Sequence, residues 1–166
     1  MNIVLLSALT APVPLILGFV WYDPRFFGKA WAAASTNAGE VEIESARMPL
    51  IFISAYILAF MVAYLLPEMM LHQSGLHQLL GTEPVFITDP TLRAAYDVAA
   101  IANSHSLHSF GHGALYGTVL GLFLAVPIVG IPSLFDGRDW KYIGIKASYW
   151  VVSLALMGGL MCQFAP

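Results

Sequence analysis

The sequence predicts an all-α integral membrane protein, a single domain over residues 1–166 that forms a bundle of four transmembrane helices. Hydrophobic residues make up 58% of the chain and charged residues 10%, against about 45–50% and about 25% in soluble domains. The mean hydropathy is +0.75. Crossing the roughly 30 Å hydrocarbon core takes about 20 apolar helical residues. Four stretches meet that length: about 2–22, 48–71, 113–135 and 140–164.

The first span contains no Lys or Arg. It therefore lacks the basic region of a signal peptide, and we expect it to be retained. Pro12 and Pro14 lie in its middle, and each can kink the helix. After the span, Asp23 suits a helix cap and Pro24 suits the first helical position. A short amphipathic helix in the membrane interface is predicted here, with one apolar face: Phe26, Phe27, Ala30 and Trp31.

The later spans carry prolines as well. Pro67 lies near the end of the second span, and Pro127 and Pro132 lie in the third. Membrane helices tolerate such prolines often, although a kink can also open a cavity. The connection over residues 72–104 is predicted to be partly helical, because Asp89-Pro90 has the pattern of a cap followed by a helix start.

Small residues recur every four positions on three of the spans. Such stripes let helix backbones approach closely in lipid. We expect the third span, which has the longest stripe, to be central. Its stripe would pack within the chain, which we favour because four helices need interior faces, or against a second copy. The three sets are Gly113, Gly117, Gly121 and Ala125; Ala55, Ala59 and Ala63; and Ala147, Ala155 and Gly159.

Basic residues predict the orientation. Six of the seven lie on the side that holds the linkers after the first and third spans, and Arg93 alone lies on the other. The positive-inside rule then places both termini and the 72–104 connection on the exoplasmic side. Trp21, Tyr22, Trp140 and Tyr142 would form an aromatic belt at the cytoplasmic ends. The seven basic residues, against ten acidic ones, are too few to form a cationic surface that would bind nucleic acid.

All five histidines lie towards the exoplasmic end. His105, His108 and His112 would share one helical face, as would Glu68 and His72. If the second and third spans are neighbours, these four histidines and Glu68 form a candidate site for a transition metal. The alternatives are histidines bonded to water or carbonyl groups, a pH-responsive cluster, or a hydrogen bond between helices from His112.

The chain has a single cysteine, Cys162, so an intrachain disulfide is excluded.

Several motifs resemble a known family. Residues 18–24 (GFVWYDP) and 27–31 (FGKAW) are similar to its opening motif, and residues 134–138 (LFDGR), 147–150 (ASYW) and 156–159 (LMGG) to its C-terminal signature. His112-Gly113 and His72-Gln73 also resemble members. The family is the uncharacterised bacterial membrane family "domain of unknown function 1761". The resemblance implies a four-span protein of the bacterial inner membrane, and it implies no reaction. Lys146 departs from the asparagine expected there, and His105 and His108 match no motif position.

Three functions are compatible with these features. We favour a non-enzymatic membrane component that packs with itself or with a larger assembly through its small-residue faces, because no catalytic constellation is visible. The second is a metal- or cofactor-dependent membrane enzyme that uses the histidine end. The third is a small-molecule carrier with a cavity at the proline kinks, which ranks last because four spans are few and no inverted repeat is visible.

Overall fold

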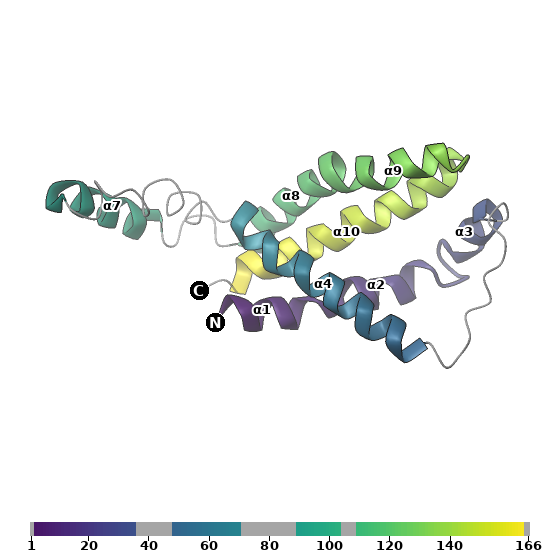
Figure 1. The fold of residues 1–166 in the computed structure, drawn as a ribbon, viewed down its shortest axis with the longest axis horizontal. Helices are drawn as coiled ribbons and strands as arrows, with labels where there is room; N and C mark the ends of the chain where they lie inside the picture. Colours follow the sequence, from purple (N-terminus) through teal and green to yellow (C-terminus); the bar gives the residue numbers. More distant parts are fainter. Residues whose placement is uncertain (1, 36–47, 71–88, 104–108, 165–166) are drawn as a thin grey trace.

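The computed structural model describes residues 2–35, 48–70, 89–103 and 109–164, and every regular element in these ranges is helical. Figure 1 shows the helices of the bundle running roughly lengthwise. Four stretches are long and apolar enough to cross a membrane: Ile3–Trp21, Met48–Pro67, Phe110–Phe135 and Trp140–Phe164. The expected all-α fold with four membrane-spanning helices is confirmed.

The first span is broken at Ala11 into α1 (Ile3–Thr10) and α2 (Pro12–Trp21). Pro12 has no amide hydrogen to donate to the carbonyl of Ala8, four residues earlier. The hydroxyl of Tyr56 donates to that carbonyl instead, at 3.0 Å. The hydroxyl of Tyr149 donates to the carbonyl of Pro14 at 2.8 Å. Tyrosines from two other helices therefore support the backbone around the break.

The short helix after the first span, α3 (Gly28–Ser35), begins four residues later than predicted. Asp23 does not cap it. Its carboxylate accepts the amide of Arg25, and its carbonyl accepts the amides of Phe26 and Gly28, so residues 23–27 form turns. Gly28 lies so close to the carbonyl of Tyr22 that a Cβ atom would overlap it. The turn therefore needs a glycine, and the helix starts there.

The second span is α4 (Met48–Met70). Its small residues Ala59 and Ala63 are buried in the bundle, while Leu50, Ile53 and Leu58 in its first half are more than half exposed. Figure 1 shows this half diverging from α9 and α10, while Phe52 stays stacked on Phe19 of α2 with the ring centroids 5.7 Å apart.

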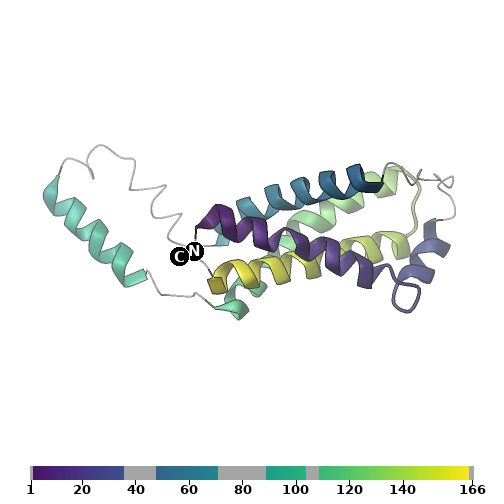
Figure 2. The same ribbon diagram turned by 90° about the horizontal axis from the view of Figure 1, so that it is seen from below.

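The helix α7 (Pro90–Asn103), in the connection between the second and third spans, starts as predicted. The Asp89 carboxylate accepts the amides of Thr91 at 2.8 Å and Leu92 at 3.3 Å. In both views (Figures 1 and 2), α7 projects from the bundle beyond the end at which the two termini lie.

The third span starts at Phe110 rather than Gly113, because the Ser109 hydroxyl accepts the amide of His112 and caps the helix. It consists of α8 (Phe110–Leu120), the π-helical turn η2 (Gly121–Ala125) and α9 (Val126–Phe135). The π turn ends two residues before Pro127, whose ring would clash with the carbonyl of residue 123 in a regular α-helix. The wider turn relieves that clash, and no π turn was expected from the sequence.

The fourth span, α10 (Trp140–Phe164), occupies the centre of the bundle, where the third span was expected. In its apolar window, 44% of residues are buried, against 17% for the third span. A Cβ at Gly113 or Gly117 would overlap the carbonyl of Gly158 or Leu154, and one at Gly121 would lie 2.6 Å from the Cα of Val151. The glycine stripe therefore lies against α10 of the same chain.

Candidate functional site

The predicted metal site falls mostly outside the described residues. His72, His105 and His108 are not among them, and Glu68 lies in the last turn of α4 without a described side chain. His112 is half-buried in the first turn of α8, with its ring centroid 4.6 Å from that of Tyr116. Within the described ranges, no group of three or more His, Cys, Asp or Glu residues could hold a metal ion. The five-residue set therefore remains a prediction.

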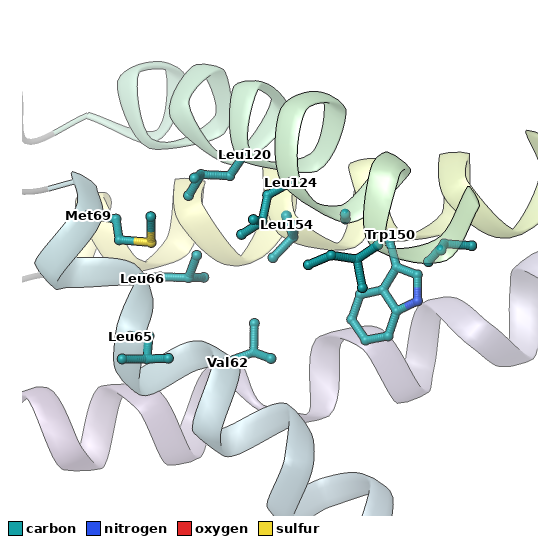
Figure 3. Close-up of a pocket in the computed structure, with 11 residues that line it drawn as sticks. Val62, Leu65, Leu66, Met69, Leu120, Leu124, Trp150 and Leu154 are labelled. Atoms are coloured by element: carbon teal, nitrogen blue, oxygen red, sulfur yellow. The ribbon is translucent and has the colours of Figure 1, made fainter. Parts of the chain in front are cut away.

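The structure contains an apolar groove of about 330 Å³ between α4, the third span (the end of α8, η2 and α9) and α10, shown in Figure 3. Leu66 and Leu154 at its base are 3% and 7% exposed, whereas Leu65 and Ile128 at its edges are 59% and 62% exposed. The groove is therefore closed at the base and open sideways. All its side chains are apolar or aromatic: Val62, Leu65, Leu66, Met69, Leu120, Leu124, Ala125, Ile128, Val129, Trp150 and Leu154.

The local structure of the third span explains one wall of the groove. Ala125 ends the π turn, and its methyl group leaves space that a larger side chain would fill. The opposite wall comes from the second half of α4, through Val62, Leu65, Leu66 and Met69. Trp150 of α10 reaches into the space between the walls, with its indole ring visible in Figure 3. The prolines had indicated that a kink could open a cavity, but no pattern identified the α4 and α10 residues that complete it.

An aromatic cluster lies at the end of the bundle where α2 stops. The indole N–H of Trp21 donates to the carbonyl of Ile145 at 3.1 Å. The ring of Tyr22 lies 5.4 Å from that of Trp31 and 5.5 Å from that of Tyr149. Burial, with smaller contributions from neighbouring tyrosines, raises the pKa of Tyr22 to about 12. These contacts dock α2 and α3 on α10.

Two cations lie beside one tyrosine at the same end. The guanidinium carbon of Arg138 is 5.3 Å from the ring centroid of Tyr142, and the ammonium nitrogen of Lys146 is 5.4 Å from it. Lys146 also donates to the Tyr142 hydroxyl at 3.3 Å. Two positively charged side chains therefore lie beside the same aromatic ring.

In chemical terms, the described part of the chain offers an apolar groove and a small cationic group beside it. The groove suits a hydrocarbon ligand, because a polar ligand would lose its hydrogen bonds to water there. The cationic group suits an anion.

Comparison with known proteins gives a family and no function. The model of the family described as "Protein of unknown function (DUF1761)" matches residues 5–162, nearly the whole chain. No curated protein matches, and no solved structure matches.

Proposed function

The chain belongs to the DUF1761 family, and we propose that it is a non-enzymatic accessory protein of the bacterial inner membrane that holds a lipid hydrocarbon chain. The observation that carries this proposal is the sideways-open apolar groove between α4, η2–α9 and α10. Its volume of about 330 Å³ lies within the range of roughly 300–1,000 Å³ typical of ligand pockets. An engineered apolar cavity of about 150 Å³ is enough to bind benzene.

A lipid chain is the occupant that the surroundings favour. The groove residues on α4, η2–α9 and α10 belong to stretches apolar enough to lie in the bilayer. Ordered water needs several polar partners, and only the indole N–H of Trp150 is available among these side chains. The exposed edges, Leu65 and Ile128, would face the hydrocarbon region, which supplies acyl chains at high concentration.

The small-residue stripes were expected to serve association with other chains, and they give that role little support. Gly113, Gly117 and Gly121 are in backbone contact with α10, so the longest stripe is not available to a partner. Association with a second copy or a larger assembly would use another surface. The first half of α4 is the candidate that we propose, because several of its large apolar side chains are exposed and the helix diverges there from α9 and α10 (Figure 1).

The orientation is part of the proposal. With the linkers after the first and third spans in the cytoplasm, six of seven basic residues lie inside. Both termini and α7 would then be exoplasmic.

The groove can be tested by filling it. The full chain is purified in a mild detergent, and retained phospholipid is counted by native mass spectrometry. We expect the wild-type protein to retain one phospholipid and the Ala125→Phe variant to lose most of it, because the ring would occupy the groove. Ile131→Phe is the matched control, since residue 131 is 57% exposed on α9 and is not part of the groove.

Equal retention by the two variants, or no retained lipid on the wild-type protein, would contradict the proposal. Circular dichroism of each variant verifies that it is folded.

A further inference from the structure

Arg138 and Lys146 are brought together by the turn between α9 and α10. Gly137 in this turn has φ of 69°, a conformation that favours glycine. The amide of Arg138 donates to the carbonyl of Ser133 at 2.9 Å, which fixes the turn. From the other direction, Lys146 extends one helical turn back to the hydroxyl of Tyr142. Both cations are therefore held against the same ring.

Neither cation has a negative partner in the described part of the chain. One terminal nitrogen of the Arg138 guanidinium is buried and makes no hydrogen bond there. The carboxylate of Asp139 is close in sequence, but it accepts the amide of Tyr142 at 2.8 Å and caps α10. That guanidinium nitrogen is covered by protein atoms, but Arg138 as a whole is partly exposed. The planar guanidinium presents donors that fit the oxygens of phosphate.

The cationic group lies next to the groove. Lys146, Trp150 and Leu154 follow one another at intervals of four residues on α10, so they occupy neighbouring turns. Trp150 and Leu154 line the groove. At 1.5 Å per residue, Lys146 is displaced by about 6 Å along the helix axis from Trp150. An amphiphile whose head contacts Lys146 could therefore place its chain in the groove.

We propose that Arg138 and Lys146 bind the anionic phosphate headgroup of the lipid whose chain lies in the groove. This inference rests on the proposed function and adds the class of lipid. Apolar contacts within a bilayer discriminate little between lipids, because the surrounding tails are equally apolar. A headgroup that meets two cations is distinguished from one without net charge.

The test compares two lipids with identical chains. Phosphatidylglycerol, which is anionic, and phosphatidylcholine, which has no net charge, are titrated onto the full chain in a non-ionic detergent and followed by native mass spectrometry. Each cation near an anionic lipid surface contributes about 1 kcal/mol, which corresponds to about fivefold in affinity. We therefore expect at least a fivefold preference for phosphatidylglycerol.

Variants separate the site from general electrostatics. Arg138→Gln and Lys146→Gln should each reduce the preference about fivefold. Lys141→Gln removes the same charge from an exposed residue at the same end of α10, and it should leave the preference unchanged. A third arm adds inorganic phosphate, which should not displace the lipid.

The outcomes are distinguishable from those of the groove experiment. Equal binding of the two lipids, with loss of both in Ala125→Phe, would overturn the headgroup site and leave the groove proposal intact. Equal losses from Lys141→Gln and Lys146→Gln would overturn the headgroup site as well. Displacement of lipid by phosphate would identify a soluble anion as the ligand and overturn the lipid assignment. A preference that persists in Ala125→Phe, and is lost in Arg138→Gln, would support the headgroup site and contradict the groove.

Discussion

Gly117 shows how a single residue determines the packing of the bundle. A Cβ atom there would overlap the backbone of Leu154 in α10, which cannot move like a side chain end. We expect Gly117→Ala to lower the free energy of unfolding by about 1–3 kcal/mol through overpacking. The measurement is thermal unfolding in detergent. Gly111→Ala is the control, because nothing lies within 4 Å of its added Cβ; similar destabilisation of both variants would refute this interpretation.

Because the pKa of Tyr22 is raised, we expect the free energy of unfolding to depend on pH in the alkaline range. Its pKa is raised from 10.0 to about 12, chiefly by burial, so the folded chain holds the phenolic proton more tightly than the unfolded chain does. The stability contributed by Tyr22 is present below about pH 10 and is lost as the pH rises towards about 12. We expect Tyr22→Phe to lose less stability over this interval than the wild-type protein. Tyr64→Phe, at an exposed residue of α4, should behave as wild type; a steeper loss in Tyr22→Phe would show the opposite sign.

His112 is the one candidate metal ligand whose side chain the structure describes, and its ring contacts Tyr116. Tyr116 lies one turn along the same helix, so this contact leaves the metal site untested. Because the proposed function needs no metal, we expect protein purified without a histidine tag to contain less than about a tenth of an equivalent of zinc, copper or iron. Elemental analysis after metal supplementation measures it. A stoichiometric metal that is lost in His112→Ala would establish the metal site instead.

At the scale of elements, the break between α1 and α2 depends on a partner helix. The carbonyl of Ala8 accepts a hydrogen bond from Tyr56 of α4 because Pro12 has no amide hydrogen to give. We expect Tyr56→Phe to reduce stability by about 1 kcal/mol, the net value of a typical hydrogen bond. Thermal unfolding measures the effect, and Tyr64→Phe again serves as the control. Unchanged stability would mean that the carbonyl needs no partner there.

The boundaries of the elements were predictable to different degrees. The fourth span begins at Trp140 and ends at Phe164 as expected, and the Asp139 carboxylate caps its start by accepting the amide of Tyr142. The predicted start of α3 at Pro24 was wrong, because the carbonyl and carboxylate of Asp23 accept hydrogen bonds within turns and the helix begins at Gly28. The π turn was missed, because the sequence shows that Pro127 must disturb the helix but not whether a kink or a wider turn results.

At the scale of the whole molecule, orientation in the membrane can be tested with introduced cysteines. Cys162 is fully buried, and its replacement by alanine gives a cysteine-free background. Thr91→Cys on α7 and Asp136→Cys before α10 are exposed sites on opposite predicted sides. We expect an impermeant maleimide to label residue 91 in intact cells and residue 136 only after lysis. The reverse pattern would invert the orientation.

The third span was expected at the centre of the bundle, but α10 lies there. The third span has the longest glycine stripe, but that stripe serves one neighbour, α10. The least apolar of the four spans is the most buried one. Its polar side chains, such as Ser153 and Tyr149, are sheltered among helices rather than turned to lipid. Low hydropathy within a membrane span was therefore the better signal of a central position.

The sequence alone determined the four spans, their approximate ends and the family, because apolar length and local motifs are properties of continuous segments. It also showed which faces could pack closely. Only the tertiary structure decided that α10 is central and that α4 diverges from α9 to leave the groove. It also placed Arg138 and Lys146 on one ring. Periodicity gives the direction of a face but not the partner, since in lipid that choice depends on the shapes of both surfaces.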